Sequence, residues 1–308
     1  MASGIIFELE STTGTMTFSS TTFAAKLLLF GEYTILKGAQ ALAVPWQRFG
    51  GFWTLAETEN AFALETFTAL SAYLKKQTFE ANFLADAFDS AIAEGLIFQS
   101  DIPRGYGVGS SGALSAAVYQ AFFEGQASDL EALQQELGRI ESFFHGSSSG
   151  VDPLISYVNR PVWVVDKNEK RAVDLDLQPG HFFLLDTGIA RETEGLVATF
   201  LKKCQSPGYE AALRSVLVPA TNAVIEAVLK GNYQAVGPLF EAISAFQWGY
   251  FQEMIPETLH QVWQFGLDSG AYALKLCGAG GGGYLLGWMA TSSEEPEILS
   301  AFTRIPLP

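Results

Sequence analysis

Residues 103–112 read Pro103-Arg-Gly-Tyr-Gly-Val-Gly-Ser-Ser-Gly112, and this stretch decides how the rest of the 308-residue chain is interpreted. It follows a short apolar run, Leu96–Gln99, and precedes apolar residues spaced along one helix face. Glycine lets a backbone approach a ligand closely, and the unpaired N–H groups of a helix start favour anions. The stretch therefore predicts a phosphate-binding loop formed by Gly105, Gly107, Val108, Gly109, Ser110, Ser111 and Gly112. A flexible turn with a serine cap is the simpler alternative.

Two familiar phosphate loops do not fit this stretch. No Gly-Lys-Ser/Thr closes it, which excludes a Walker A loop. Gly107-Val-Gly109-Ser-Ser-Gly112 matches the GxGxxG pattern of dinucleotide-binding folds. That pattern requires a strand ending in an acidic residue after the helix, whereas the next segment, Asp129–Phe144, has helical periodicity.

Glu141 faces the predicted interior of the Asp129–Phe144 helix. At about 100° per residue it lies beside the apolar stripe that contains Leu137 and Phe144. An inward-facing carboxylate is costly unless it is paired or binds a metal. Glu141 is therefore a candidate Mg²⁺ ligand, with a salt bridge or a frayed last helical turn as the alternatives.

The segment after this helix, His145-Gly-Ser-Ser-Ser-Gly-Val-Asp152, carries two competing signals. Its GxSxG pattern would make Ser148 the nucleophile of a serine hydrolase, with His260 or His181 as the base. That nucleophile turn must follow a strand, and here a helix precedes it. Asp152 is the more useful residue, either as a catalytic carboxylate or as an ordinary aspartate at a helix start.

Lys26 lies inside the apolar run Phe23-Ala-Ala-Lys-Leu-Leu-Leu-Phe30. A lysine there needs an ionic partner, or it must extend its amine to the surface. An Asp152–Lys26 pair beside a phosphate loop would suit phosphoryl transfer, because the acid accepts a hydroxyl proton and the cation keeps that acid ionised.

The composition excludes several classes of protein. Eighteen Lys and Arg against 33 Asp and Glu give a net charge of −15, which disfavours nucleic acid and anionic membrane surfaces as partners. Two cysteines are too few for a disulfide framework, as in a reducing cytoplasm. No secretory signal is evident at the N-terminus. We therefore expect a cytoplasmic protein that binds neither nucleic acid nor a membrane surface.

Alternating hydrophobic patterns predict mixed helices and strands. The predicted strands are Ile5–Leu9, Met16–Ser19, Ala25–Phe30, Ala41–Val44, Gly51–Leu55, Leu96–Gln99, Pro161–Asp166, His181–Asp186, Tyr272–Leu276 and Tyr284–Trp288. One predicted helix follows the glycine stretch 103–112 and another is Asp129–Phe144. The other predicted helices are Thr66–Lys76, Ala81–Glu94, Glu194–Lys203, Tyr209–Lys230, Tyr233–Trp248, Glu257–Ser269 and Pro296–Phe302. The turn at 178–180 predicts a boundary between domains 1–178 and 179–308.

Three segments in this order resemble the glycine motifs of the GHMP kinases. They are Lys26-Leu-Leu-Leu-Phe-Gly-Glu-Tyr-Thr-Ile-Leu-Lys-Gly38, the stretch 103–111, and Lys275-Leu-Cys-Gly-Ala-Gly-Gly-Gly-Gly283. Within that family, Glu141 followed by His145-Gly-Ser-Ser-Ser-Gly-Val-Asp152 is most similar to the mevalonate kinases, as is the segment 186–193.

The resemblance implies an α+β fold of two domains, the first like domain 2 of ribosomal protein S5 and the second ferredoxin-like. It also implies an ATP- and Mg²⁺-dependent enzyme, allows a homodimer, and assigns roles to the matching positions. Asp152 would be the base and Lys26 its partner, while Ser111 and Glu141 would hold Mg²⁺. The implied substrate-binding residues are Glu32, Tyr33, His145, Thr193 and Gly280.

Three positions depart from the family pattern. Tyr33 stands where mevalonate kinases usually carry His, and Gly-Glu-Tyr is more typical of phosphomevalonate kinases; Gly112 replaces a usual Ala and Cys277 a usual Thr. The expected reaction phosphorylates the primary hydroxyl of mevalonate, with phosphomevalonate or another small alcohol as the alternative acceptor. A serine hydrolase and a non-catalytic nucleotide-binding protein remain the alternatives from other classes.

Overall fold

The computed structural model describes residues 21–58, 60–177, 181–190, 194–290 and 296–307. Its first sheet contains β1 (Phe23–Phe30), β2 (Ala41–Leu55), β4 (Leu96–Ser100), β6 (Val162–Val164) and β7 (Lys170–Ala172). The order is β1-β2-β6-β7, and β4 pairs with the far end of β2. Every pairing in this sheet is antiparallel.

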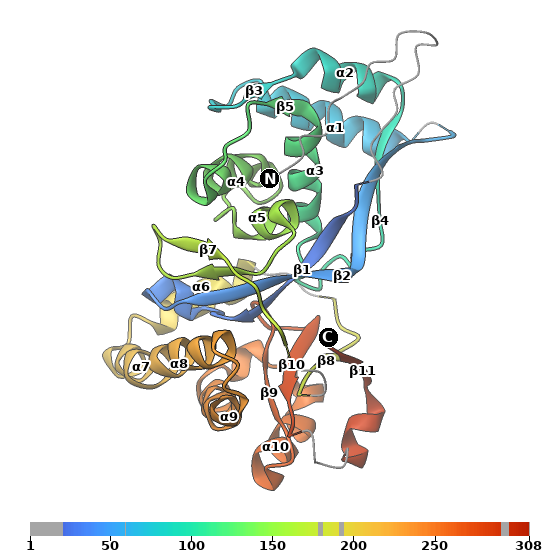
Figure 1. Cartoon of the computed structure of the whole chain (residues 1–308). Coiled ribbons are helices and arrows are strands. Elements are labelled where there is room, and N and C mark those ends of the chain that lie inside the picture. Colours follow the sequence, from blue (N-terminus) through green and yellow to red (C-terminus); the bar gives the residue numbers. More distant parts are fainter. Residues whose placement is uncertain (1–20, 59, 178–180, 191–193, 291–295, 308) are drawn as a thin grey trace.

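The long strand β2 replaces two shorter predicted strands. Its start pairs with β6 and its end with β4, so it connects two parts of the sheet (Figure 1). Ala24 of β1 pairs with Gly50, whereas its neighbour Ala25 pairs with Trp46. The extra β2 residues form a bulge, which bends the strand without ending it. The polar residues in the bulge therefore resemble a turn in the sequence.

Helices cover one face of this sheet (Figure 1). They are α1 (Ala61–Leu74), α2 (Ala85–Ala93), α3 (Ser110–Phe122), α4 (Leu130–His145) and α5 (Val151–Val158), with a small sheet of β3 (Asn82–Phe83) and β5 (Phe123–Glu124). The central helix α3 contacts α4, α5 and β1. Its fully buried Ala113, Ala116 and Ala117 allow these close approaches because their side chains are small. Helix α3 therefore holds its N-terminus in a fixed position beside α4 and α5.

A second antiparallel sheet follows in the order β11-β8-β10-β9. Its strands are β8 (Phe182–Asp186), β9 (Ala273–Leu276), β10 (Tyr284–Trp288) and β11 (Thr303–Pro306), and the accompanying helices are α6 (Glu194–Lys203), α7 (Pro207–Ala212), α8 (Val218–Leu229), α9 (Tyr233–Tyr250) and α10 (His260–Ser269). Short 3-10 helices occupy Thr34–Lys37, Gln252–Met254, Glu257–Leu259 and Glu297–Ala301. Antiparallel sheets with segregated helices confirm the predicted α+β class.

The helical stretch Pro207–Leu229 is continuous through a π-helical turn at Leu213–Leu217, as its uninterrupted periodicity predicted. By length and composition alone it is apolar enough to cross a membrane. In the structure Leu213, Val224 and Ile225 of this stretch are fully buried against the rest of the fold, whereas Val216 is exposed.

Several expectations fall outside the described residues or differ from them. The predicted strands Ile5–Leu9 and Met16–Ser19 and the turn at 178–180 lie outside the described residues, and the division into domains 1–178 and 179–308 stays a prediction. The segment expected as a helix at Pro296–Phe302 is a 3-10 helix. The short strands β3, β5, β7 and β11 were not expected, because two to four residues are too few to show a period, and β3 occupies the start of the helix predicted from Ala81. Helix α5 was expected only as a possible helix start at Asp152, although Val151, Leu154 and Ile155 have helical spacing.

Candidate active site

Lys26 and Asp152, on different elements, form an ion pair. Lys26 projects from the middle of β1 and Asp152 from the first turn of α5, and Nζ lies 2.9 Å from Oδ1. The lysine side chain is 7% exposed and the aspartate side chain 37%. The ammonium is thus shielded from water, while part of the carboxylate remains accessible to a ligand.

The glycine loop lies directly against this pair. The backbone N–H of Lys26 donates to the carbonyl of Val108, at 2.9 Å, which ties β1 to the loop. Gly109 has φ +81° and precedes the first residue of α3. A Cβ at Gly109 would lie 2.8 Å from Cγ of Lys26, so a side chain there would collide with the lysine stem. The loop therefore needs glycine both for its conformation and for its closeness to Lys26.

The loop has the form that the sequence predicted for binding phosphate. Gly105, Gly107 and Gly109 all have positive φ, and Val108 is buried as an apolar anchor. Ser110 and Ser111 occupy the first turn of α3. Their position puts the partial positive charge of the helix start beside the Lys26 ammonium. Two sources of positive potential thus meet in a chain of net charge −15.

Glu141 is buried and faces the same region, as its helical phase predicted. It is 5% exposed, and its Oε1 accepts a hydrogen bond from the Ser111 hydroxyl at 3.0 Å. The other oxygen, Oε2, accepts one from Ser148, and Ser111 Oγ also lies 2.9 Å from Nε2 of His145. Burial, and then the negative charge of Asp152, raise the pKa of Glu141 to about 7. The electrostatic influence of Asp152 indicates that both carboxylates belong to one site.

The donor set around Glu141 fits Mg²⁺. Mg²⁺ prefers hard oxygen ligands and, with phosphates bound, takes only one or two from the protein. Ser111 and Glu141 offer a hydroxyl and a carboxylate beside the glycine loop. Over the described ranges no group of three or more His, Cys, Asp and Glu side chains could enclose a metal. The arrangement thus suits a metal that is shared with a ligand's phosphates.

A buried ion pair that the sequence did not reveal lies between Glu32 and Lys275. Nζ of Lys275 is 2.6 Å from Oε1 of Glu32, and the side chains are only 1% and 2% exposed. The same ammonium donates to the carbonyls of Leu29 and Leu276. Burial raises the pKa of Glu32, and the charge of Lys275 opposes this shift. Here the Glu32 carboxylate is engaged by Lys275, and its predicted contact with substrate stays a prediction.

Tyr33 adopts a strained backbone. Its φ is +61°, and the N–H of Thr34 donates to the carbonyl of Glu32 at 2.6 Å, so residues 32–34 form a rare γ-turn with positive φ. The buried ring packs on Phe200 and Phe251, and its hydroxyl donates to the carbonyl of Ala279 at 2.5 Å. The first and third glycine motifs are therefore joined through both Tyr33 and Lys275.

The glycine run 278–283 packs on the predicted phosphate loop, in agreement with its interpretation as a backbone-only surface. A Cβ at Gly283 would lie 2.6 Å from the carbonyl oxygen of Tyr106. A Cβ at Gly280 would lie 2.5 Å from the carbonyl oxygen of Met254. The predicted contact of Gly280 with substrate is untested, and Thr193 lies outside the described residues.

The arrangement around Ser148 does not form a hydrolase triad. Ser148 donates to the carboxylate of Glu141, and it follows helix α4 where a nucleophile turn requires a strand. His181 stacks on Trp288 and contacts the carbonyl of Met289, while His260 contacts that of Ile255. Neither histidine pairs with Ser148.

Comparison with known proteins identifies the class that this fold and site define. Residues 68–160 match the model of the GHMP kinases N-terminal domain, and residues 224–306 match that of the GHMP kinases C-terminal domain. Together these matches cover more than half of the chain. The chain therefore belongs to the GHMP kinase family.

Its relatives include a mevalonate kinase of Methanothermobacter thermautotrophicus. The two are 23% identical over 279 residues, which cover 87% of this chain and 89% of the relative. Among solved structures, L. major mevalonate kinase in complex with R-mevalonate aligns with a TM-score of 0.63 at 17% identity, with 89% of each chain covered. Streptococcus pneumoniae phosphomevalonate kinase aligns with a TM-score of 0.62 at 14% identity, over 89% of this chain and 92% of that one. These structural similarities extend the family fold to nearly the whole chain.

Proposed function

We propose that the protein is an ATP- and Mg²⁺-dependent kinase that transfers the γ-phosphoryl group to the primary hydroxyl of mevalonate. The observation that carries the proposal is the Lys26–Asp152 pair, with its atoms 2.9 Å apart, beside a glycine loop at a helix start. Phosphoryl transfer needs mainly positioning and charge neutralisation, and these groups supply both.

Asp152 is the base in this proposal. Its partly exposed carboxylate accepts the proton of the acceptor hydroxyl as that oxygen bonds to the γ-phosphorus, while the bond from this phosphorus to the bridging oxygen breaks and ADP leaves. Lys26 keeps Asp152 ionised and offsets the negative charge that develops on the transferred group. The buried stem of Lys26 and the hydrogen bond from its backbone to Val108 hold the ammonium at the loop.

The loop 105–112 and the Ser111–Glu141 pair form the nucleotide side of the site. Backbone N–H groups at the start of α3 hold the phosphates, and Ser111 and Glu141 hold Mg²⁺. The metal, when bound, neutralises charge on the phosphate oxygens. The inward-facing Glu141 supports this assignment because a buried carboxylate is stabilised by a cation.

Mevalonate is the proposed acceptor because the segment from Glu141 to Asp152 resembles the mevalonate kinases and the sequence relative above carries that name. Phosphomevalonate is the second candidate, favoured by Tyr33 after Gly-Glu and by the similar phosphomevalonate kinase structure. In either case Glu32, Tyr33, His145, Thr193 and Gly280 are the proposed substrate-binding residues.

A coupled ADP-release assay with mevalonate, phosphomevalonate, homoserine and galactose tests the proposal. We expect the highest kcat/KM with mevalonate, and no turnover when EDTA removes Mg²⁺. A higher value with phosphomevalonate would select the second candidate. ADP release that no acceptor increases would contradict a kinase of this kind and favour a non-catalytic nucleotide-binding protein.

We also propose the division at residue 178, a cytoplasmic location and a small-molecule partner, without nucleic acid or membrane. A homodimer is the proposed assembly, and sedimentation equilibrium would test it. Limited proteolysis near residues 178–180 would test the domain boundary, because exposed connections are cleaved first.

A further inference from the structure

The hydroxyl of Ser148 lies between two elements that the proposed reaction uses. It donates a hydrogen bond to Oε2 of Glu141 and accepts one, at 2.9 Å, from the backbone N–H of Gly150. Gly150 is the N-cap of α5, the helix that carries Asp152 in its first turn. One side chain therefore connects the proposed metal ligand with the start of the helix that holds the proposed base.

The two oxygens of Glu141 have different surroundings. Oε1 accepts from Ser111, the other proposed metal ligand, whereas Oε2 accepts from Ser148. A metal between Ser111 and Glu141 would replace the first hydrogen bond and leave the second intact. The bond from Ser148 therefore fixes the rotation of the carboxylate and directs Oε1 towards Ser111.

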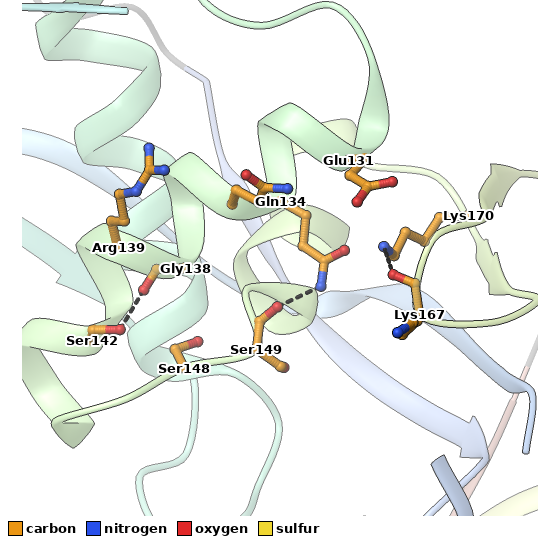
Figure 2. Close-up of a pocket in the computed structure, with 10 residues that line it drawn as sticks. Glu131, Gln134, Gly138, Arg139, Ser142, Ser148, Ser149, Lys167 and Lys170 are labelled. Atoms are coloured by element: carbon orange, nitrogen blue, oxygen red, sulfur yellow. Dashed lines mark hydrogen bonds between the residues drawn. The ribbon is translucent and has the colours of Figure 1, made fainter. Parts of the chain in front are cut away.

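Among the described residues, the hydrogen bonds to the Glu141 carboxylate come from Ser111 and Ser148, so that Ser148 alone holds Oε2. On its other side Ser148 lines a cavity of about 350 Å³ between α4 and the β6–β7 hairpin, which carries Lys167 in its turn and Lys170 at the start of β7 (Figure 2). Figure 2 shows the 148–149 backbone passing beneath α4, with the side chain of Gln134 donating to the carbonyl of Ser149. This neighbouring contact holds the loop backbone and does not reach Glu141.

We propose that Ser148 is a positioning residue that aligns Glu141 for the metal–nucleotide complex and couples that alignment to the N-terminus of α5. This inference rests on the proposed function. It gives the hydroxyl at position 148 a role that differs from both the hydrolase nucleophile and a passive loop residue.

The comparison of Ser148→Ala with Ser147→Ala isolates the hydroxyl. Ser148→Ala removes one oxygen and almost no volume, and leaves Oε2 and the Gly150 N–H without their partner. Ser147 is the matched control because, within the described part of the chain, its exposed side chain makes no hydrogen bond. Ser148→Thr retains the hydroxyl and serves as the rescue variant.

Calorimetric titration with a non-hydrolysable ATP analogue, in Mn²⁺ and in EDTA, measures the effect without turnover. For Ser148→Ala we expect the dissociation constant in Mn²⁺ to rise about tenfold or more, as is usual when a partner of a metal ligand is removed. In EDTA the dissociation constant should remain within about twofold of the wild-type value, because no metal then contacts Glu141. Ser147→Ala and Ser148→Thr should resemble the wild type in both titrations.

Parallel Mg²⁺ titrations of turnover separate this inference from the proposed function. Ser148→Ala should need about tenfold more Mg²⁺ yet approach the wild-type kcat at saturation. The role of Ser148 would be overturned, even if the wild type is an active kinase, by an unchanged dissociation constant of Ser148→Ala in Mn²⁺. An equal increase of this constant in Ser147→Ala, or in EDTA, would overturn it as well. A wild type that binds the Mn²⁺ complex but phosphorylates no acceptor would contradict the proposed function instead.

Discussion

Replacement of Gly112 by alanine tests whether the spacing of α3 and α5 sets the position of Asp152. A Cβ at Gly112 would lie 2.9 Å from both the carbonyl carbon of Asp152 and the nitrogen of Pro153. This separation is about 0.5 Å short of the 3.4 Å at which ordinary contact begins. Both contacted atoms are backbone, so α5 must move as a unit and Asp152 moves with it.

We expect a loss of activity that can be measured separately from the loss of stability. Because a 1 Å misplacement can cost about 100-fold in rate, a shift of half that size should lower kcat roughly tenfold, or about 1.4 kcal/mol in the activation barrier. The free energy of unfolding should fall by only about 0–2 kcal/mol, because overpacking costs about 1–3 kcal/mol and alanine recovers about 1 kcal/mol relative to glycine within a helix.

The coupled ADP assay and thermal unfolding measure the two effects. Gly249→Ala is the control, because this exposed position on α9 has no atom within 4 Å of the new Cβ. It should retain the wild-type kcat and unfold at the same or a slightly higher temperature. If Gly112→Ala behaved like this control, the close approach of α3 and α5 would not constrain Asp152, and the reasoning would be refuted.

Three further predictions concern the buried carboxylates. Burial raises the pKa of Glu141 to about 7, so protons should compete with Mg²⁺ for this carboxylate. The Mg²⁺ activation constant of the wild type should therefore rise about tenfold for each pH unit below 7. The constant of Glu141→Gln should not rise in this way. The same shift should make the metal-free protein less stable as pH rises from 4.5 to about 7, because the native state retains a proton that the unfolded chain releases. Urea unfolding in EDTA measures this decrease. A free energy of unfolding that depended on pH in the same way in the wild type and in Glu141→Gln would contradict the expectation. Lys275→Met should lower the free energy of unfolding by about 3–5 kcal/mol because Glu32 is left buried without its counter-charge, and Glu32→Gln in addition should recover part of this loss. Denaturant unfolding that gave wild-type stability for Lys275→Met alone would contradict this expectation.

Local patterns predicted much of the candidate site. The position of Lys26 within an apolar strand, the helical phase of Glu141 and the glycines before α3 each reflect a period of a few residues, and the structure brings all three together with Asp152. These features could be recognised because a side chain's direction follows from the helix or strand that carries it.

These local patterns could not predict contacts between residues that are far apart in the sequence. Glu32 and Lys275 are 243 positions apart, and neither has a sequence context that requires the other. The γ-turn at Tyr33 depends on packing against Phe200 and Phe251, which come from another part of the chain. Such contacts are set by how the two sheets pack, which local periodicity does not encode.

The central claim is that Asp152, held by Lys26 at the glycine loop, takes the proton of the acceptor hydroxyl. Asp152→Asn, with Asp174→Asn as an exposed control, tests this claim when turnover and nucleotide binding are measured on the same preparations. We predict that kcat of Asp152→Asn falls by about 10²–10⁴ while the dissociation constant of the nucleotide changes by no more than a few-fold. Turnover by Asp152→Asn at the rate of the control would contradict the account.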